Sequence, residues 1–512
     1  MRRIIALAYF TSIGILAACS SGSSDFVQDT EDDLVSVIQQ LSFMVDPSVD
    51  RDLPSQDDPV VQLGKLLFFS QGLSGDGETD EFDTACASCH HPAFAGSDEL
   101  SLPYGVGAED PKLVGPGREF TGIQDSPVIG RNSISVMNVG LWDHALNHDG
   151  SVESLNPTML SNGTNGGIST PDSGYQTADD NAGDNLVMAQ TRLALTNTHM
   201  MRNHLEEGED TEVVLSHLIE RLKGNNDELE INQWLEQFRT AFDNPDGSAD
   251  ELITEANLIT ALAEYQRSMV FVFSPWRDYL LGDLDAISTD AKRGATLVLT
   301  SVDQGGLGCV SCHSGDFFTD EQYHTLAIPQ IGPGMGDDNG ESSTDDFGRF
   351  RVTGDEADRY AFRTPTLLNV VRTGPWGHNG AYTTLESIIT HHLYPRGSVE
   401  AYDTSQVNPE ISAIDFEEKT ELALAVLETQ VSNAETPLEV IVTGEFEILL
   451  VIEFLKTLTD YRLIKIEEST RHIDCVAPLI PDSGDENPDA LRLNAEDSNG
   501  ISLLGNFNGC SD

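Results

Sequence analysis

Two five-residue stretches with one pattern decide the fold of this 512-residue chain: Cys86-Ala87-Ser88-Cys89-His90 and Cys309-Val310-Ser311-Cys312-His313. In each stretch, two thiols three positions apart can form thioethers with the two vinyl groups of one haem, and the adjacent histidine then binds the iron. A single cluster could be chance or half of a zinc site, but zinc would need a second cysteine or histidine pair at similar spacing. Two copies predict two covalently bound haems of the c type.

Charge and length narrow the class of protein further. The chain has 28 Lys and Arg residues against 85 Asp and Glu residues, so its formal net charge is −57. This charge argues against nucleic acid as a partner and against adsorption to an anionic lipid surface. It favours a basic or neutral docking partner. A chain of 512 residues exceeds the size of one hydrophobic core, which favours two domains.

The N-terminus has the features of a secretory signal. Arg2 and Arg3 precede an apolar run, Ile4–Ala18, that is too short to span a bilayer. The run ends in Leu16-Ala17-Ala18-Cys19, which resembles the bacterial lipobox and predicts that Cys19 is lipidated. Ser20 rather than Asp follows, which predicts the periplasm or cell surface, anchored in the outer membrane by lipid alone. The alternative is ordinary signal cleavage with a spare cysteine.

The rest of the chain predicts a mainly α protein, because helical periodicity recurs and no strand-rich region stands out. We expect a signal peptide (1–18), an acidic tether (19–58), a first haem domain (59–285) with a loop insertion (156–185), a second haem domain (286–462) with an insertion (397–445), and a tail (463–512). Cys475 and Cys510 lie in the tail, and an oxidising compartment predicts a disulfide between them.

Several further segments carry a family resemblance. They are Leu63–Phe69, Gly130–Asn132, Ser274–Asp283, Phe317–Asp320, Phe362–Asn369, His378–Gly380 and Phe454–Thr459. With them the chain resembles the bacterial di-haem cytochrome c peroxidases and their MauG-type relatives over about residues 55–160 and 255–460. The resemblance implies two cytochrome c-like haem domains with long irregular loops and insertions. It also implies that peroxide binds at the first haem, whereas the second haem accepts electrons from a donor and relays them.

The resemblance also implies a calcium ion between the domains. Its protein ligands would be the side chain of Asn132 and the carbonyls of Thr373 and Pro375. Hard oxygen ligands of this kind suit calcium. The alternative is that these residues only shape turns.

The second haem departs from the family at its distal ligand, which is usually methionine or tyrosine. That position lies fourteen residues after His378 and is occupied by His392, with His391 beside it. Histidine on both sides of the iron should lower the reduction potential. The alternative is that both histidines are exposed residues at a helix end.

The first haem departs from the family in its acid–base group, which is a Glu near a Met. The matching stretch, residues 197–202, contains no Glu. His199 could replace it, or Glu206 or Glu207 could reach in, because peroxide cleavage needs a group that moves protons. The alternative is that His199 only packs. No histidine occurs at residues 92–143, so the first haem should be open without prior reduction.

A further departure concerns the tryptophan that lies between the haems in the family. His148 occupies that position here, and Trp142, six residues earlier, could substitute for the missing indole.

These features predict an oxidoreductase that reduces hydrogen peroxide with electrons from a small periplasmic donor, a cytochrome c or a cupredoxin. Two alternatives stay open: a MauG-like enzyme that oxidises a residue of a partner protein, and a non-enzymatic electron-transfer or haem-sensing protein. A homodimer is compatible with an enzyme and with a non-enzymatic protein.

Overall fold

The computed structural model describes residues 21–493 apart from 42, 76–83, 107, 109, 111, 119–128, 336–344, 408–415, 465–475, 482–487 and 492. The predicted signal peptide and Cys19 lie outside the described residues, and so do Cys475 and Cys510 of the predicted disulfide. Within the described part, no helix combines the length and the apolar composition that crossing a membrane requires.

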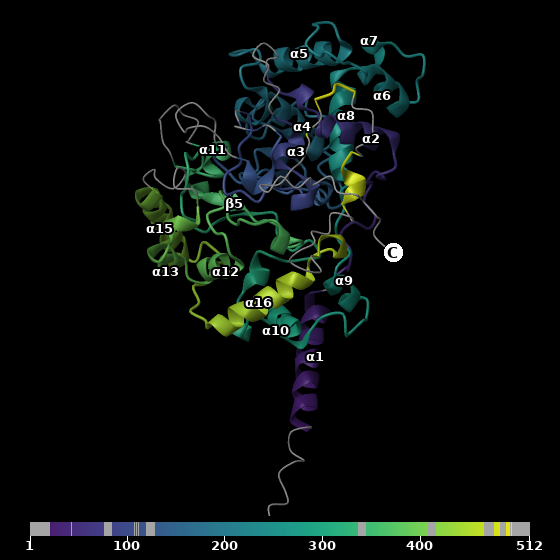
Figure 1. Ribbon diagram of the computed structural model, residues 1–512. Coiled ribbons are helices and arrows are strands. Elements are labelled where there is room, and N and C mark those ends of the chain that lie inside the picture. The colour runs from purple at the N-terminus through teal and green to yellow at the C-terminus, as the bar shows by residue number, and fades with distance from the viewer. Residues whose placement is uncertain are drawn as a thin grey trace, which may run out of the picture.

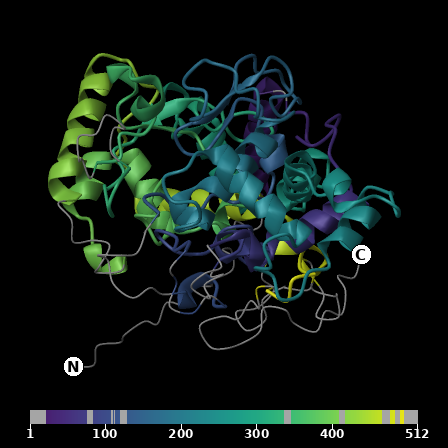
Figure 2. The same ribbon diagram turned by 90° about the horizontal axis from the view of Figure 1, so that it is seen from above.

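The molecule has two mainly helical halves (Figure 1). The earlier part of the chain forms α2 (Pro59–Phe68), α3 (Cys86–Cys89), α4 (Leu186–Thr196), α5 (Thr211–Lys223), α6 (Trp234–Ala241), α7 (Ala249–Leu252) and α8 (Glu255–Arg267). The later part forms α9 (Pro275–Leu280), α10 (Thr289–Leu299), α11 (Phe350–Thr353), α12 (Leu385–Leu393), α13 (Pro395–Glu400), α15 (Phe416–Ser432) and α16 (Glu445–Thr457). Seen from above, α15 and α6 lie on opposite sides of the molecule (Figure 2). The mainly α class is therefore confirmed.

Each half is built around one close helix crossing. In the first half α2 crosses α8, and a Cβ added to Gly64 would lie 1.9 Å from the Ala261 carbonyl oxygen. In the second half α10 crosses α16, and a Cβ added to Gly294 would lie 1.9 Å from the Leu450 carbonyl oxygen. Only glycine allows backbones to approach this closely. A haem-attachment motif follows α2 in one half and α10 in the other, so both motifs are placed by the same construction.

The strands are short and lie where the halves meet. Strands β1 (Ala145–Leu146), β2 (Val152–Ser154) and β3 (Ile168–Ser169) form one antiparallel sheet, and β4 (Tyr323–Thr325) pairs with β5 (Ala361–Arg363) in another. Strand β3 belongs to the predicted loop insertion and ties it to the first half. The backbone N–H of Arg363 donates to the His148 carbonyl at 2.8 Å, which joins the second sheet to the first half.

The prediction of an acidic tether at residues 19–58 is wrong for part of its length. The segment contains α1 (Ser21–Leu41), which packs against α10 and buries Leu34 completely. Leu34, Val37 and Ile38 follow the spacing of one helix face, and this apolar stripe outweighs the acidic content of the segment. The Glu31 carboxylate also accepts hydrogen bonds from Lys292 and from the Tyr279 hydroxyl.

The insertion at 397–445 contains a long helix. Its helix α15 buries Ala423, Leu424 and Leu427 against a small cluster that includes Phe347 and Tyr360. The described part of the tail packs on the first half, where the Tyr265 hydroxyl donates to the Leu479 carbonyl at 2.6 Å.

Candidate functional site

The first attachment motif presents its histidine ready for a metal. The imidazole of His90 uses Nδ1 to bond the Gly96 carbonyl at 3.3 Å, which leaves Nε2 available. Burial lowers the pKa of His90, so the ring is neutral. Burial also raises the pKa of the Cys86 and Cys89 thiols to about 12. Both thiols are therefore protonated at neutral pH.

A cavity of about 710 Å³ adjoins this motif. Its volume lies in the range of about 300–1,000 Å³ that is typical of cofactor and ligand sites. The wall includes the motif residues, α4, the π-helical turn η5 (Thr198–Arg202), residues 169–175 of the loop insertion, and residues of the second half. The cavity therefore fits a large, mainly apolar group held by Cys86, Cys89 and His90.

The second motif faces another histidine. His313 bonds the Phe318 carbonyl through Nδ1 at 3.2 Å, and His392 on α12 bonds the Ile388 carbonyl through Nδ1 at 2.8 Å. Their ring centres are 6.4 Å apart. An imidazole nitrogen lies about 2 Å from a metal that it binds, so two rings on opposite sides of one metal have centres about 6 Å apart. The pair therefore has the spacing of two ligands to one iron.

The neighbouring His391 is buried and fully engaged. Its Nδ1 lies 2.8 Å from the Tyr382 hydroxyl, and its Nε2 lies 2.8 Å from the Leu326 carbonyl oxygen. The alternative that both histidines are exposed at a helix end is therefore wrong. His391 has no ring nitrogen left for a metal, whereas His392 has one.

The first cavity lacks this arrangement. The histidines in its described lining are His90 and His148, and His148 directs Nε2 at the Asn132 carbonyl oxygen at 3.0 Å. Burial lowers the pKa of His148 to about 4, so this ring is neutral as well. The side of the first cavity opposite His90 is therefore not closed by a second histidine of the described chain.

The three predicted acid–base residues lie outside the cavity lining. The side chain of His199 is exposed, because Asn197 caps the η5 turn and thereby directs Met200 and Met201 to the cavity instead. Glu206 and Glu207 follow this turn and do not line the cavity either. The geometry therefore gives no support to this part of the prediction.

Both glutamates have partners elsewhere. A carboxylate oxygen of Glu206 lies 2.9 Å from His217 Nδ1. Glu207 is exposed and lies 3.8 Å from His204 Nδ1.

Two residues that line the cavity were missed. Gln190 on α4 is partly buried, and its Oε1 has no hydrogen-bond partner among the described residues. Asp172, in the loop insertion, is an exposed carboxylate that accepts from Arg192 at 2.9 Å. The signal for Gln190 was the one side-chain amide in helix α4, and an insertion rich in polar residues concealed Asp172.

Two of the three residues of the predicted calcium site, Asn132 and Pro375, lie together. The Asn132 Nδ2 donates to the Pro375 carbonyl at 2.7 Å, while the buried Oδ1 of Asn132 has no partner among the described residues. A half-turn of this amide would bring two oxygens together, which is the chemistry that calcium requires. The donor set therefore fits a calcium ion.

Trp142 and a buried ion-pair group lie where the halves meet. Trp142 packs edge-to-face on Phe317 of the second half at 4.9 Å. Arg131 pairs with Asp149 at 2.5 Å and with Asp346 at 2.7 Å, and this pairing holds the pKa of Asp346 well below its ordinary range despite burial. The two halves are thus joined by paired charges as well as by apolar contacts.

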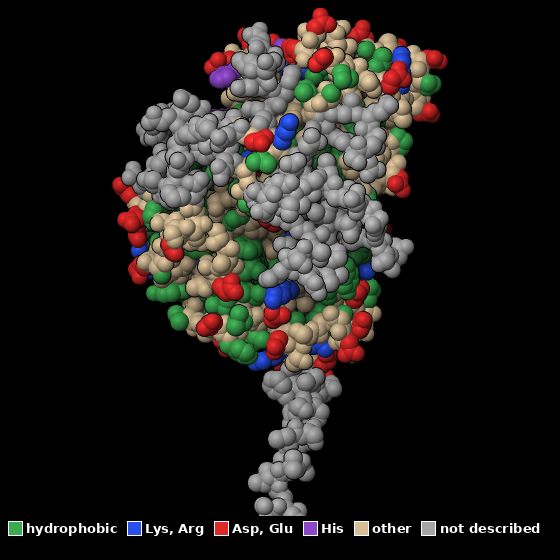
Figure 3. Space-filling view, viewed as in Figure 1, with side chains coloured by type: hydrophobic (Ala, Val, Ile, Leu, Met, Phe, Trp, Pro, Cys, Tyr) green, Lys and Arg blue, Asp and Glu red, His purple; other side chains and the backbone are tan. Residues whose placement is uncertain are grey.

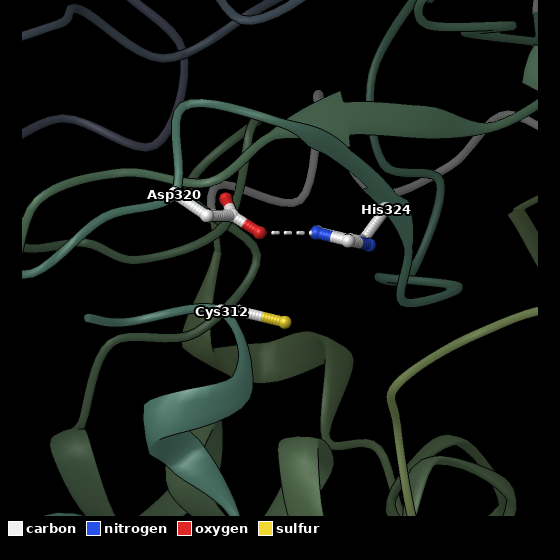
Figure 4. Close-up of side chains that lie close together, drawn as sticks. All are labelled: Cys312, Asp320 and His324. Carbon is white, nitrogen blue, oxygen red and sulfur yellow. Dashed lines mark hydrogen bonds and ion pairs between the residues drawn. The ribbon is translucent and has the colours of Figure 1, made fainter.

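Cys312, Asp320 and His324 lie together beside the second motif (Figure 4). Asp320 accepts from His324 Nε2 at 2.8 Å, and the potential ligand atoms of the three residues all lie within 4.8 Å of one another. The Cys312 sulfur belongs to a haem-attachment motif, so a thioether would leave two ligands. Zinc sites use three or four protein ligands, so this group does not make a separate metal site.

Comparisons with known proteins agree with this picture. The family model described as di-haem cytochrome c peroxidase matches residues 58–285. The chain is 28% identical to the methylamine utilization protein MauG of Methylorubrum extorquens over 65% of this chain and 68% of that protein. It is 26% identical to the cytochrome-c peroxidase IdrP1 of a Pseudomonas species over 70% and 77% of the two chains. The crystal structure of the diheme peroxidase BthA from Burkholderia thailandensis shares the fold, with a TM-score of 0.51 and 17% identity over 83% of this chain and 92% of that one.

The family model matches the first half, whereas the structural likeness to BthA covers 83% of the chain and so extends into both halves. The chain is therefore similar to the di-haem cytochrome c peroxidases and MauG proteins, and it is a peroxidase-type oxidoreductase that carries two covalently bound haems of the c type.

Proposed function

We propose that this protein reduces hydrogen peroxide to water at the first haem site, with electrons that a small periplasmic donor delivers through the second. The observation that carries the proposal is the difference between the sites: His313 faces His392, whereas His90 faces no second histidine among the described residues. Two imidazoles on one iron suit electron transfer, and a free position suits peroxide binding.

The reaction consumes one peroxide, two protons and two electrons and yields two water molecules. The haems, when bound, supply the iron that exchanges these electrons. Cys86, Cys89 and His90 hold the first haem, and Gln190 can orient peroxide because its amide is partly buried, lines the cavity and has an acceptor oxygen without a partner among the described residues. A neutral amide cannot supply protons, so another group must do so.

Asp172 is the residue that best fits this proton-transfer role. The cavity is lined by two carboxylates that the structure describes, Asp149 and Asp172. Asp149 is buried and paired with Arg131, whereas Asp172, which pairs with Arg192, is exposed to solvent. We therefore assign proton delivery to Asp172 rather than to His199.

The second haem would be held by Cys309, Cys312, His313 and His392. A donor that docks on this protein meets an acidic surface, because the net charge is −57 and Asp and Glu side chains surround the face shown in Figure 3. Electrostatic complementarity favours a donor with a basic or neutral contact surface.

A reaction with pre-reduced protein tests the proposal. One equivalent of peroxide should oxidise both haems of the fully reduced protein, because each haem contributes one electron. Donor-dependent peroxide consumption should follow with a reduced cytochrome c or cupredoxin. Peroxide that leaves both haems reduced would contradict the proposal.

A second candidate is the oxidation of a residue on a partner protein, as in the MauG-like alternative. Met200 and Met201 line the cavity, and the stretch that contains them lacks the glutamate that the resemblance to the peroxidases implies. The missing glutamate favours this candidate. It would be supported if peroxide oxidised the haems while no small donor sustained turnover.

We also propose that calcium binds Asn132 Oδ1 and the carbonyls of Thr373 and Pro375, which the orphaned Asn132 oxygen supports. A periplasmic location with lipid attachment at Cys19 and a Cys475–Cys510 disulfide remain predictions from the sequence.

A further inference from the structure

Arg363 stands out among the residues that line the first cavity. It ends strand β5, is only 6% exposed, and contributes to the cavity wall. Its guanidinium carbon lies 3.4 Å from the centre of the Trp142 ring, and its Nε donates to the Asn147 carbonyl at 3.0 Å. These two contacts fix the plane of the guanidinium. The buried Nη1 has no hydrogen-bond partner among the described residues.

The guanidinium of Arg363 has no ion-pair partner within the described chain, although Glu321 and Asp149 lie near enough to favour its charge. Burial lowers its pKa to about 10, so the side chain is still a cation at neutral pH. No carboxylate of the described residues forms an ion pair with it, whereas the buried Arg131 has two and Arg349 has Glu153. An unpaired buried charge is destabilising unless an anion compensates it. The fold therefore leaves a place for an anion at Arg363.

Nearby carboxylates cannot fill this place, because they already have partners. Asp149 pairs with Arg131, and the Glu321 carboxylate accepts from the backbone N–H groups of Asp143 and His144. A guanidinium with a free N–H edge matches a carboxylate better than any other common anion except phosphate.

We infer that Arg363 binds a carboxylate in the first cavity, and that this carboxylate is a propionate of the haem attached to Cys86 and Cys89. The inference rests on the proposed attachment of that haem. A cation held against the propionate offsets its negative charge and so stabilises the reduced iron. The same cation stacked on Trp142 disfavours the loss of an electron from the indole, because the ring would become positive beside it. Trp142 is therefore a platform for Arg363 rather than a substitute for the missing inter-haem tryptophan.

Two readouts on the purified di-haem protein test this inference. Anaerobic potentiometric titration follows each haem, and resonance Raman spectroscopy follows the propionate bending bands. In Arg363→Gln, the ratio of reduced to oxidised first haem at a fixed potential should fall at least about tenfold, which corresponds to about 59 mV for one electron. One propionate band should shift at the same time. Arg363→Lys should restore the ratio in part, because it retains the charge.

Arg349→Gln is the matched control. It removes the same charge from a buried arginine near the junction of the halves, but Arg349 pairs with Glu153 and does not line the cavity. It should leave the propionate bands unchanged. If Arg363→Gln does not accumulate with two haems, Arg363→Lys decides through the same readouts, because its propionate band should still shift when the planar guanidinium is lost.

Three results would overturn the inference. The first is a ratio within about twofold of the wild type, since a tenfold change is expected. The second is a changed ratio with unshifted propionate bands, which would indicate a distant charge effect. The third is a wild-type spectrum that responds to added acetate while Arg363→Gln does not, which would indicate a free carboxylate as the ligand. Peroxide turnover is not among the readouts, so failure of the proposed reaction would leave this test intact.

Discussion

The two haem sites share one construction and differ on one side. In both halves a glycine lets two helices cross closely, the attachment motif follows, and a carbonyl holds Nδ1 of the motif histidine. Opposite that histidine, the second site has His392 at 6.4 Å between ring centres, whereas the first has a cavity of about 710 Å³. A repeated scaffold thus gives one site suited to relaying electrons and one suited to binding a small molecule. The residues that distinguish them come from α12 and from the η5 turn.

The largest effect should come from removing the residue that closes the second site. In His392→Ala, one of the two haems should change from low-spin to high-spin, because its iron loses a strong nitrogen ligand. Electron paramagnetic resonance of the oxidised protein measures the change. His391→Ala is the control and should leave the low-spin signal in place, because both ring nitrogens of His391 have other partners. A low-spin signal that survives in His392→Ala would show that the ligand lies elsewhere.

Proton delivery at the first site should be the next most sensitive function. Asp172→Asn should slow peroxide turnover by about 10²-fold or more, the usual range for loss of an acid–base group. His199→Ala should change the rate by less than about threefold, well below that range, because the side chain is exposed and does not line the cavity. Stopped-flow mixing with peroxide measures both rates. The opposite ranking of the two variants would return the role to His199.

Asp98 follows the first attachment motif and Asp320 follows the second. The two carboxyl groups should change the free energy of unfolding with pH in opposite directions. Burial raises the pKa of Asp98 to about 7, and its Oδ2 has no partner among the described residues. In the unfolded chain this carboxyl ionises near pH 4, so the free energy of unfolding should fall as the pH rises from about 4 to 7. Asp98→Asn should remove this loss and stabilise the protein at pH 8 by up to roughly 4 kcal/mol.

Asp320 in the second half provides the control for Asp98. Burial alone would raise its pKa, but the hydrogen bonds from His324 and the Gln322 backbone lower it. Its ionised form therefore adds stability above about pH 4, which is lost as the pH falls below the ordinary range. Asp320→Asn should destabilise the protein at pH 8, as measured by denaturant unfolding. Equal signs for the two variants would refute the contrast.

The smallest effect should come from calcium, which would lie between the sites. Free calcium at 100 times its dissociation constant should raise the free energy of unfolding by about 2.7 kcal/mol, because it binds only the folded state. Thermal melts with calcium and with a chelator measure this difference. Asn132→Ala should abolish it. If the melting temperature of the wild type does not change when the chelator is added, the calcium site is excluded.

The attachment residues could be predicted because the chemistry keeps them contiguous. Two thiols and a histidine must reach one haem, so their spacing is visible in the sequence alone. His392 followed from its distance to the His378 element, and the regular helix α12 preserves that register. The mainly α class could be predicted from helical periodicity, and the two haem-bearing halves from the two attachment motifs.

The side chains that line the first cavity could not be predicted, because an irregular turn controls which of them face it. The π-helical geometry of η5 and the Asn197 cap expose His199 and direct Met200 inward. Asp172 approaches the cavity through a loop insertion whose path depends on β2–β3 pairing and on Arg192. The N-terminal helix was missed because its acidic residues concealed the stripe that includes Leu34.

The difference between the two sites is tested most directly by the electron paramagnetic resonance spectrum of the oxidised protein as isolated. We expect one high-spin and one low-spin ferric haem in equal amounts, and we expect peroxide to remove the high-spin signal first. Two low-spin haems that do not respond to peroxide would contradict an open first site and would indicate a protein that only transfers electrons.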